Sequence, residues 1–150
     1  MACAIFGSDN TPDCIMPALE DALINAVNSL NIHDFMVGDS NSFDRMAYAA
    51  AVKVSRQYMG VRVRKVLDHQ PSAAERQDSN VVCPEEIMMI KPEYLGRYRD
   101  RWMLHLADYL IVYYPESERD ASDVIRYASG RSTPWVNLAR IQTDSVSGGL

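Results

Sequence analysis

Two short runs of small polar residues are the parts of this sequence best suited to bind a ligand. They are GSDNTP, which begins at residue 7, and GDSNS, which begins at residue 38. Each run follows an apolar stretch and precedes a helical pattern, so its amides and hydroxyls lie at a helix start, where they can hold a phosphate. An ordinary capped loop between a strand and a helix has the same composition. The candidate ligand residues are Gly7, Ser8, Asp9, Thr11, Gly38, Asp39, Ser40 and Ser42.

Three arginines supply the positive charge that a phosphate group would need. Arg45 follows the second polar run, and Arg99 and Arg101 lie beside Trp102 in RYRDRWML. An arginine can hold a phosphate through two hydrogen bonds, and an aromatic ring can stack on a base. In the alternative interpretation this segment is an amphipathic helix with a buried Trp102 and solvated arginines.

Carboxylates and histidines give weaker signals for chemistry. Asp39 and Asp44 would repel a phosphate, so one of them is expected to hold ribose hydroxyls or to pair with Arg45. His69 beside Asp68 is the one acid–base candidate among the three histidines. No paired spacing of metal ligands occurs, and neither the GxGxxG nor the phosphate-loop signature is present, so we expect no metal and no cofactor.

The elements that must position these residues follow from apolar periodicity. Helices are expected over about 12–30, with a later start or a kink at Pro17, over 43–58 with Ser42 as the N-cap, and over 98–107. A last helix is expected from Ser117 or Asp120 to Gly130. Strands are expected over 2–6, 33–38, 61–67, 108–114 and 134–138, and residues 85–90 are expected to form a short strand or a turn.

Strands that alternate with helices predict a three-layer α/β fold, in which helices cover both faces of a mostly parallel five-stranded sheet. In such sheets, ligands bind beyond the carboxyl ends of the strands, where the strand order reverses. The loops that meet at that edge are GSDNTPD, GDSNSFDR, DHQPSAAE and PESERDAS. We expect one domain over residues 1–140, with a long irregular segment at about 68–96, and a flexible tail over 141–150.

The composition limits the partners. A chain of 150 residues that is 47% hydrophobic suits one well-buried domain. A net charge of −5 disfavours duplex nucleic acid, and no apolar run reaches the roughly 18 residues of a membrane span. Because the chain lacks a leader pattern and Cys3, Cys14 and Cys83 show no metal spacing, we expect a cytoplasmic protein with reduced thiols, bound to no membrane.

Several motifs together resemble a known family. They are CAIFGSDNTP, FMVGDSNSFDRMAYAAAVK, VRVRKVL, RYRDRWML, ADYLIVYY and WVNL, which cover most of residues 2–138. They are similar to the patterns FGHRxTP, YVGxxGxFDRM, RNRWM and VINL of a small bacterial and phage branch of the SLOG superfamily. The resemblance implies a Rossmann-like fold and the binding of nucleotides or nucleotide-derived ligands.

The resemblance also frames the possible functions. Some SLOG relatives cleave an N-glycosidic bond, and others sense nucleotide signals in anti-phage immunity. The family's His-Arg pair is Ser8-Asp9 here, and the PGGxGTxxE motif of the phosphoribohydrolases is absent. We therefore expect a protein that binds a nucleotide-derived molecule without turnover, as a sensor or as a sponge for an immune signal. Relatives of this type are oligomeric, which implies a homodimer or a larger homo-oligomer.

Two alternatives stay open. The first is a nucleoside or nucleotide N-glycosidase, of the phosphoribohydrolase or deoxyribosyltransferase kind. The similar deoxyribosyltransferases carry a nucleophilic glutamate near the position of Val124, so the catalytic candidates are Asp44, Glu118 and Asp123. The second alternative is a protein-interaction module with a vestigial site, in which the 68–96 segment contacts a partner.

Overall fold

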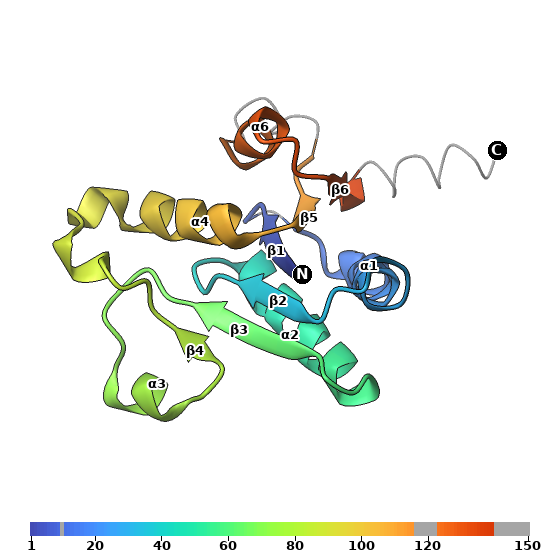
Figure 1. Cartoon of the computed structure of the whole chain (residues 1–150), viewed down its shortest axis with the longest axis horizontal. Coiled ribbons are helices and arrows are strands. Elements are labelled where there is room, and N and C mark those ends of the chain that lie inside the picture. The colour runs from blue at the N-terminus through green and yellow to red at the C-terminus, as the bar shows by residue number, and fades with distance from the viewer. Residues whose placement is uncertain (10, 116–122, 140–150) are drawn as a thin grey trace.

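The computed structural model describes residues 1–9, 11–115 and 123–139. These residues form an α/β fold around a parallel sheet with the strand order β4-β3-β2-β1-β5-β6 (Figure 1). The predicted fold class is confirmed, but the sheet has six strands where five were expected. The strands are β1 (Ala2–Gly7), β2 (Asp34–Val37), β3 (Arg62–Val66), β4 (Val81–Val82), β5 (Tyr109–Tyr113) and β6 (Trp135–Asn137).

Helices cover both faces of the sheet, as the sequence predicted. The α-helices are α1 (Met16–Leu30), α2 (Ser42–Gln57), α3 (Ala73–Gln77), α4 (Leu95–Leu106) and α6 (Asp123–Gly130). Among these, α1 and α2 pack on one face, and α4 and α6 pack on the other. Alternate residues of β1 show both layers: Cys3 and Ile5 contact the first pair of helices, and Ala4 and Phe6 contact the second.

The start of α1 follows the later of the two predicted possibilities. A 3-10 turn over Asp13–Ile15 precedes the helix, and Pro17 lies in its first turn. A proline is tolerated there because first-turn amides have no partner within the helix. The expected tail over 141–150 and the expected start of the last helix at Ser117 or Asp120 lie outside the described residues.

The predicted N-cap of α2 was wrong by one residue. The Oδ1 atom of Asn41, rather than the hydroxyl of Ser42, accepts the N–H of Asp44 at 2.8 Å. Asn41 has the extended backbone of a cap residue, whereas Ser42 is the first residue of the helix. The polar run GDSNS therefore ends in a capping amide, and Ser42 is free to contact the neighbouring loop.

The segment over 68–96 contains short ordered elements instead of being irregular throughout. Helix α3 begins with a capping box, in which Ser72 and Glu75 bond each other's backbone amides. Strand β4 then pairs with β3. Two 3-10 turns follow at Ile87–Met89 and Pro92–Tyr94, so residues 85–90 form a turn and not a strand.

The strand order reverses at β1. From this strand the chain moves outward through β2, β3 and β4, and later returns to the opposite side of β1 with β5 and β6. The carboxyl ends of β1, β2 and β5 therefore surround the reversal point, which is where ligands bind in open parallel sheets. Across the described residues, no helix combines the length and apolarity needed to cross a membrane.

Candidate functional site at the carboxyl edge of the sheet

The loops after β1 and β2 are joined by side-chain hydrogen bonds to backbone carbonyls. The amide nitrogen of Asn41 donates to the carbonyl of Gly7 at 3.2 Å. The hydroxyl of Ser42 donates to the carbonyl of Asp9 at 2.8 Å. The structure therefore brings the two polar runs together at one edge of the sheet, but these donors hold the loops to each other rather than pointing freely at solvent.

The other polar residues of the first loop serve the same purpose. The amide of Ser8 donates to the carbonyl of Tyr113 at 3.1 Å, which attaches the loop to the end of β5. Ser8 is only 7% exposed, and the hydroxyl of Thr11 donates to its carbonyl. Ser8 and Thr11 thus stabilise the loop, whereas Asp9 is exposed to solvent.

Both candidate glycines are required by packing. A Cβ atom on Gly7 would overlap the ring of Phe43 at the start of α2. A Cβ atom on Gly38 would lie 2.9 Å from Oδ2 of Asp44 and 3.0 Å from Cζ of Arg99. The absent side chains therefore make room for neighbouring protein groups, which lets α2 and α4 approach the strand ends.

Arg99 is the charged centre of the edge. Its side chain is buried and donates to the hydroxyl of Ser40 at 2.7 Å. The guanidinium pairs with Asp100 at 3.1 Å, with Asp39 at 3.4 Å and with Asp68 at 3.7 Å. This one cation thus joins the ends of β2 and β3 to α4, and its donors are directed at protein oxygens rather than at a ligand.

The remaining arginine candidates lie elsewhere. Arg45 is exposed in the first turn of α2. The guanidinium of Arg101 stacks on the ring of Tyr127 from α6, with Cζ 4.7 Å from the ring centroid. Trp102 packs as a partly buried side chain against the α4 and α6 layer. Within the RYRDRWML segment, Arg99 therefore points to the carboxyl edge of the sheet, whereas Arg101 points to α6.

Of the three catalytic candidates, the structure describes Asp44 and Asp123, which contact different partners. Asp44 is 5% exposed and accepts the amide of Ser40 at 2.9 Å. Burial raises the pKa of Asp44, although hydrogen bonds from the backbone of Ser40 and Asn41 and the nearby charge of Arg99 oppose the shift. Asp123 is exposed at the start of α6 and lies 3.9 Å from Arg97. Glu118 lies outside the described residues.

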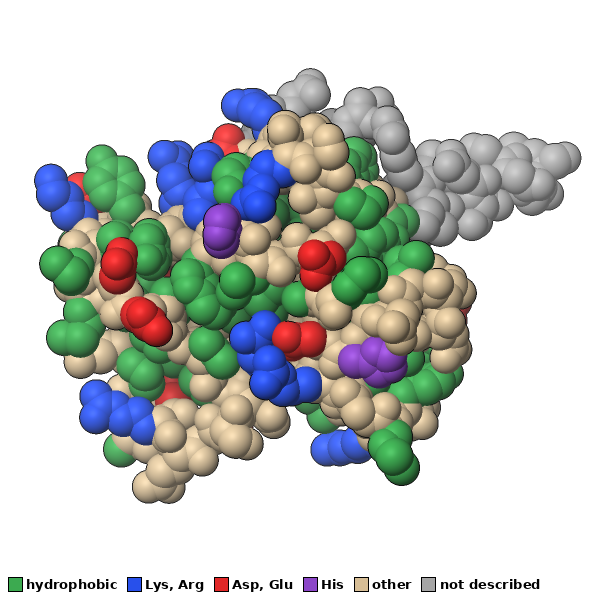
Figure 2. All heavy atoms as spheres, in the orientation of Figure 1, with side chains coloured by type: hydrophobic (Ala, Val, Ile, Leu, Met, Phe, Trp, Pro, Cys, Tyr) green, Lys and Arg blue, Asp and Glu red, His purple; other side chains and the backbone are tan. Residues whose placement is uncertain are grey.

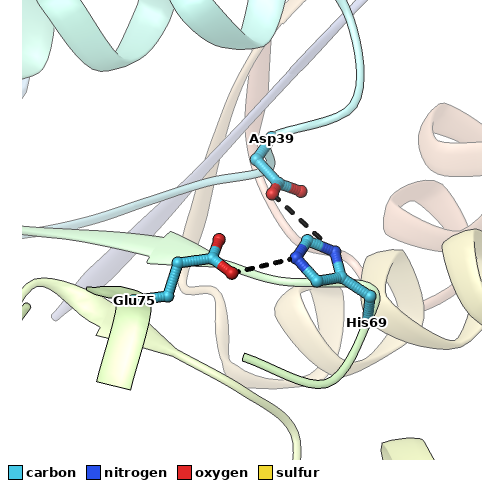
Figure 3. Close-up of side chains that lie close together, drawn as sticks. All are labelled: Asp39, His69 and Glu75. Carbon is cyan, nitrogen blue, oxygen red and sulfur yellow. Dashed lines mark hydrogen bonds and ion pairs between the residues drawn. The ribbon is translucent and has the colours of Figure 1, made fainter. Parts of the chain in front are cut away.

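His69 shares the carboxylates of Asp39 and Asp68 with Arg99. Figure 3 shows its ring between Asp39 and Glu75. Nδ1 of His69 lies 3.0 Å from Oδ1 of Asp68 and 4.0 Å from Oδ2 of Asp39. Nε2 lies 3.3 Å from Oε1 of Glu75, which α3 supplies. Adjacent Asp68 and His69 were visible in the sequence, whereas Asp39 and Glu75 were not connected to them because they come from a different loop and from a short helix.

The protonation of this group reflects its neighbours. The hydrogen bond to Asp68 raises the pKa of His69, and Glu75 and Asp39 add to the shift. Burial opposes ionisation of Asp68, but its hydrogen bond to His69 and the charge of Arg99 outweigh burial and lower its pKa. Burial raises the pKa of Asp39, and the negative charge of Asp68 adds to that effect.

The same group has the composition of a metal site. One ligand atom each from Asp39, His69 and Glu75 lie within 4.8 Å of one another. The expectation of no metal site rested on spacing along the chain, which does not register three ligands from separate segments. In the described residues this is where the geometry suits an ion best.

Two hollows lie near these elements. A cavity of about 40 Å³ at the reversal point is lined by Gly7, Gly38, Asn41, Arg99 and Tyr114, among others, and is large enough only for water. A shallow groove of about 530 Å³ runs along the start of α4 and is lined by Met89, Ile90, Lys91, Tyr94, Arg97, Tyr98 and Arg101. Figure 2 shows hydrophobic side chains interleaved with Lys and Arg on this side of the molecule. Any ligand larger than water would thus have to lie over the edge, because the cavity is too small to hold it.

Comparisons with known proteins identify no relative from which a function could be inferred. No family model matches the sequence, and no curated protein matches it significantly. The function is therefore argued from the fold, from the geometry of the edge and from the motifs of the sequence.

Proposed function

We propose that this chain is a small SLOG-like protein that binds a nucleotide-derived molecule at the carboxyl edge of its sheet, without turning it over. One observation carries the proposal: the loops after β1 and β2 are joined through Asn41 and Ser42 at the point where the strand order reverses. Ligands of open parallel sheets bind at such reversal points. The protein would serve as a sensor or as a sponge for a nucleotide signal.

The charges of the edge suggest which part of the ligand lies there. Arg99 is already paired with three carboxylates, so a bare phosphate would find little free positive charge. The carboxylates of Asp39 and Asp68 remain 17% and 29% exposed, and ribose hydroxyls are good donors to such groups. We therefore propose that the sugar contacts Asp39 and Asp68, and that the phosphate lies toward His69.

Binding without turnover is supported by the catalytic candidates. Asp44 is buried, and its carboxylate accepts the amide of Ser40 at 2.9 Å, while its own backbone amide donates to Oδ1 of Asn41 at 2.8 Å. Asp123 pairs with Arg97 and Arg126 on the α4 and α6 side. A nucleophilic carboxylate must reach the anomeric carbon, and neither of these two carboxylates is free to do so at the edge.

A titration of nucleotides tests the proposal with one matched pair of variants. Ser42→Glu adds a bulky negative charge beside the joined loops and should abolish binding while the fold is kept. Ser29→Glu adds the same side chain at an exposed position near the end of α1 and should leave affinity unchanged. Calorimetry with a panel that includes ADP-ribose and cyclic nucleotides measures both. Equal affinity in the two variants would remove the assignment of this edge.

One observation favours the N-glycosidase alternative. His69 is about half exposed and its Nδ1 lies 3.0 Å from Asp68, an arrangement that can transfer a proton. An enzyme of this kind would release free base from a nucleotide of the panel, and the His69→Gln variant would lose that activity. If chromatography finds no free base, this alternative fails.

The self-association expected from the sequence also stays a proposal. Met88, Met89 and Tyr94 are 71%, 84% and 50% exposed beside the groove, and exposed apolar patches often pair subunits. A homodimer in the cytoplasm would cover them. Light scattering tests this directly, since a dimer has twice the 16.9 kDa mass of the chain and a monomer would contradict the proposal.

A further inference from the structure

The hydrogen bonds of His69 pose a problem of charge. Asp68 accepts from Nδ1 at 3.0 Å, which makes Nδ1 the nitrogen that carries the proton. The other nitrogen, Nε2, then has a lone pair, and it faces the carboxylate oxygen Oε1 of Glu75 at 3.3 Å. Two acceptors at this distance repel each other unless a proton or a metal ion lies between them. The geometry therefore calls for a positive charge at this point.

A second proton on the imidazole or a metal ion can supply that charge, whereas the neighbouring residues do not. Asp39, Asp68 and Glu75 all lie within 4.0 Å of the ring nitrogens of His69. Figure 3 shows two of them, Asp39 and Glu75, beside the ring. Arg99 is paired with Asp39 and Asp68 and is shared with Asp100. Glu75 accepts the backbone amide of Ser72 at 2.9 Å, which fixes its carboxylate in place. Three carboxylates therefore surround His69, and the only neighbouring cation described for them, Arg99, contacts two of the three.

The distances suit a metal ion. Two ligand atoms that each lie about 2.1 Å from one ion are roughly 3.0–3.4 Å apart for octahedral to tetrahedral angles. The 3.3 Å between Nε2 and Oε1 falls in that range. Asp39 completes the set, because one ligand atom from each of the three residues lies within 4.8 Å of the others. Its Oδ2 atom is 4.0 Å from Nδ1, so its side chain must rotate toward Nε2 to reach the same ion. The hydrogen bond from Nδ1 to Asp68 is the outer contact that metal-binding histidines commonly make.

We propose that Asp39, Nε2 of His69 and Glu75 bind a divalent cation, with Asp68 orienting the imidazole. One imidazole with two carboxylates suits Zn²⁺ or Mn²⁺ better than Mg²⁺. His69 is 46% exposed, so the ion keeps positions open to solvent. A second step rests on the proposed function: a phosphate of the nucleotide-derived ligand binds the ion at these open positions. The ion would then explain how an anionic ligand is held at an acidic edge.

Metal titration of the full chain, freed of metal by chelation, tests the cation site without any nucleotide. Co²⁺ absorption and Zn²⁺ calorimetry should each report one ion per chain. Glu75→Gln and His69→Gln should each weaken binding by about tenfold or more. Glu75→Gln retains an oxygen for the capping box, so α3 should stay folded. His105→Gln, on α4 beside Arg131, is the matched control and should bind as the parent does.

The outcomes separate the two proposals. Absence of saturable binding, or affinity that is the same in both site variants and the control, would overturn the cation site. Circular dichroism on each variant excludes loss of the fold as the cause. If one ion binds but nucleotides bind equally with and without it, the bridging role is overturned and the proposed function stands. If one ion binds and no nucleotide does, the proposed function fails and the cation site stands.

Discussion

At the residue scale, the guanidinium of Arg99 determines which charges at the sheet edge remain available to a ligand. The sequence does not distinguish Arg99 from Arg97 and Arg101, which alternate with it along the same segment. A helix turns by about 100° per residue, so two residues along the chain point in very different directions. Only Arg99 points into the ends of β2 and β3, where carboxylates surround it.

Replacing Arg99 tests this assignment. Arg99→Ala leaves Asp39, Asp68 and Asp100 without their shared cation, so the free energy of unfolding should fall by about 3 kcal/mol. Arg101→Ala removes an exposed guanidinium that stacks on Tyr127 and should cost about 1 kcal/mol or less. Urea unfolding of both variants measures the difference. Equal losses would mean that Arg99 does not hold the edge together.

The pKa of His69 is a second prediction at this scale. Its hydrogen bond to Asp68 raises the pKa above the ordinary value of 6.5. The folded state therefore favours the protonated form, and this contribution to stability is complete below pH 6.5 and is lost as pH rises through the raised pKa. An NMR titration of the metal-free protein should show this, and Asp68→Asn should lower the value. A pKa of His69 at or below 6.5 in the parent would contradict the geometry.

At the element scale, the start of α2 separates two neighbouring residues that look equivalent in the sequence. Asn and Ser are both good N-caps, so composition alone does not decide between Asn41 and Ser42. The backbone decides: Asn41 is extended and Ser42 is helical. The amide side chain of Asn41 can also both accept from Asp44 and donate to Gly7, which a hydroxyl does less well over that distance.

This difference predicts unequal effects on stability. Asn41→Ala removes the cap and the contact with the first loop, so the free energy of unfolding should fall by about 1–2 kcal/mol. Ser42→Ala removes one solvent-exposed hydrogen bond to Asp9 and should cost about 0.5 kcal/mol. Thermal unfolding of the two variants is sufficient to rank them. A larger loss for Ser42→Ala would restore the cap predicted from the sequence.

Most elements were predictable from their apolar patterns, whereas β4 and α3 were not. The strands near β1, β2, β3, β5 and β6 and the cores of α1, α2 and α4 follow from apolar patterns that extend over several residues. Strand β4 has two residues and α3 has five, too few to show a period. The position of β4 depends on its contact with β3, which is made only after the chain has folded. The capping box of α3 is instead a local Ser-x-x-Glu pattern, at Ser72 and Glu75, that we did not predict from the sequence.

At the scale of the whole molecule, the sheet explains which parts of the site were foreseeable. Loops that follow parallel strands meet at one edge, so the proximity of the GSDNTP and GDSNS runs could be predicted from alternation of elements. The group formed by Asp39, His69 and Glu75 could not, because it depends on the side-by-side order of β2 and β3 and on the position of α3. The pairing of Arg99 likewise depends on how α4 crosses the sheet.

The central claim is that this edge binds a nucleotide-derived molecule intact. The most direct measurement incubates the purified chain with a nucleotide panel, removes the protein by filtration, and compares the free compounds by chromatography before and after heat denaturation. We predict that one compound disappears from the filtrate and returns unchanged on heating. A panel that stays complete in the filtrate, or a compound that returns as base and sugar phosphate, would contradict the claim.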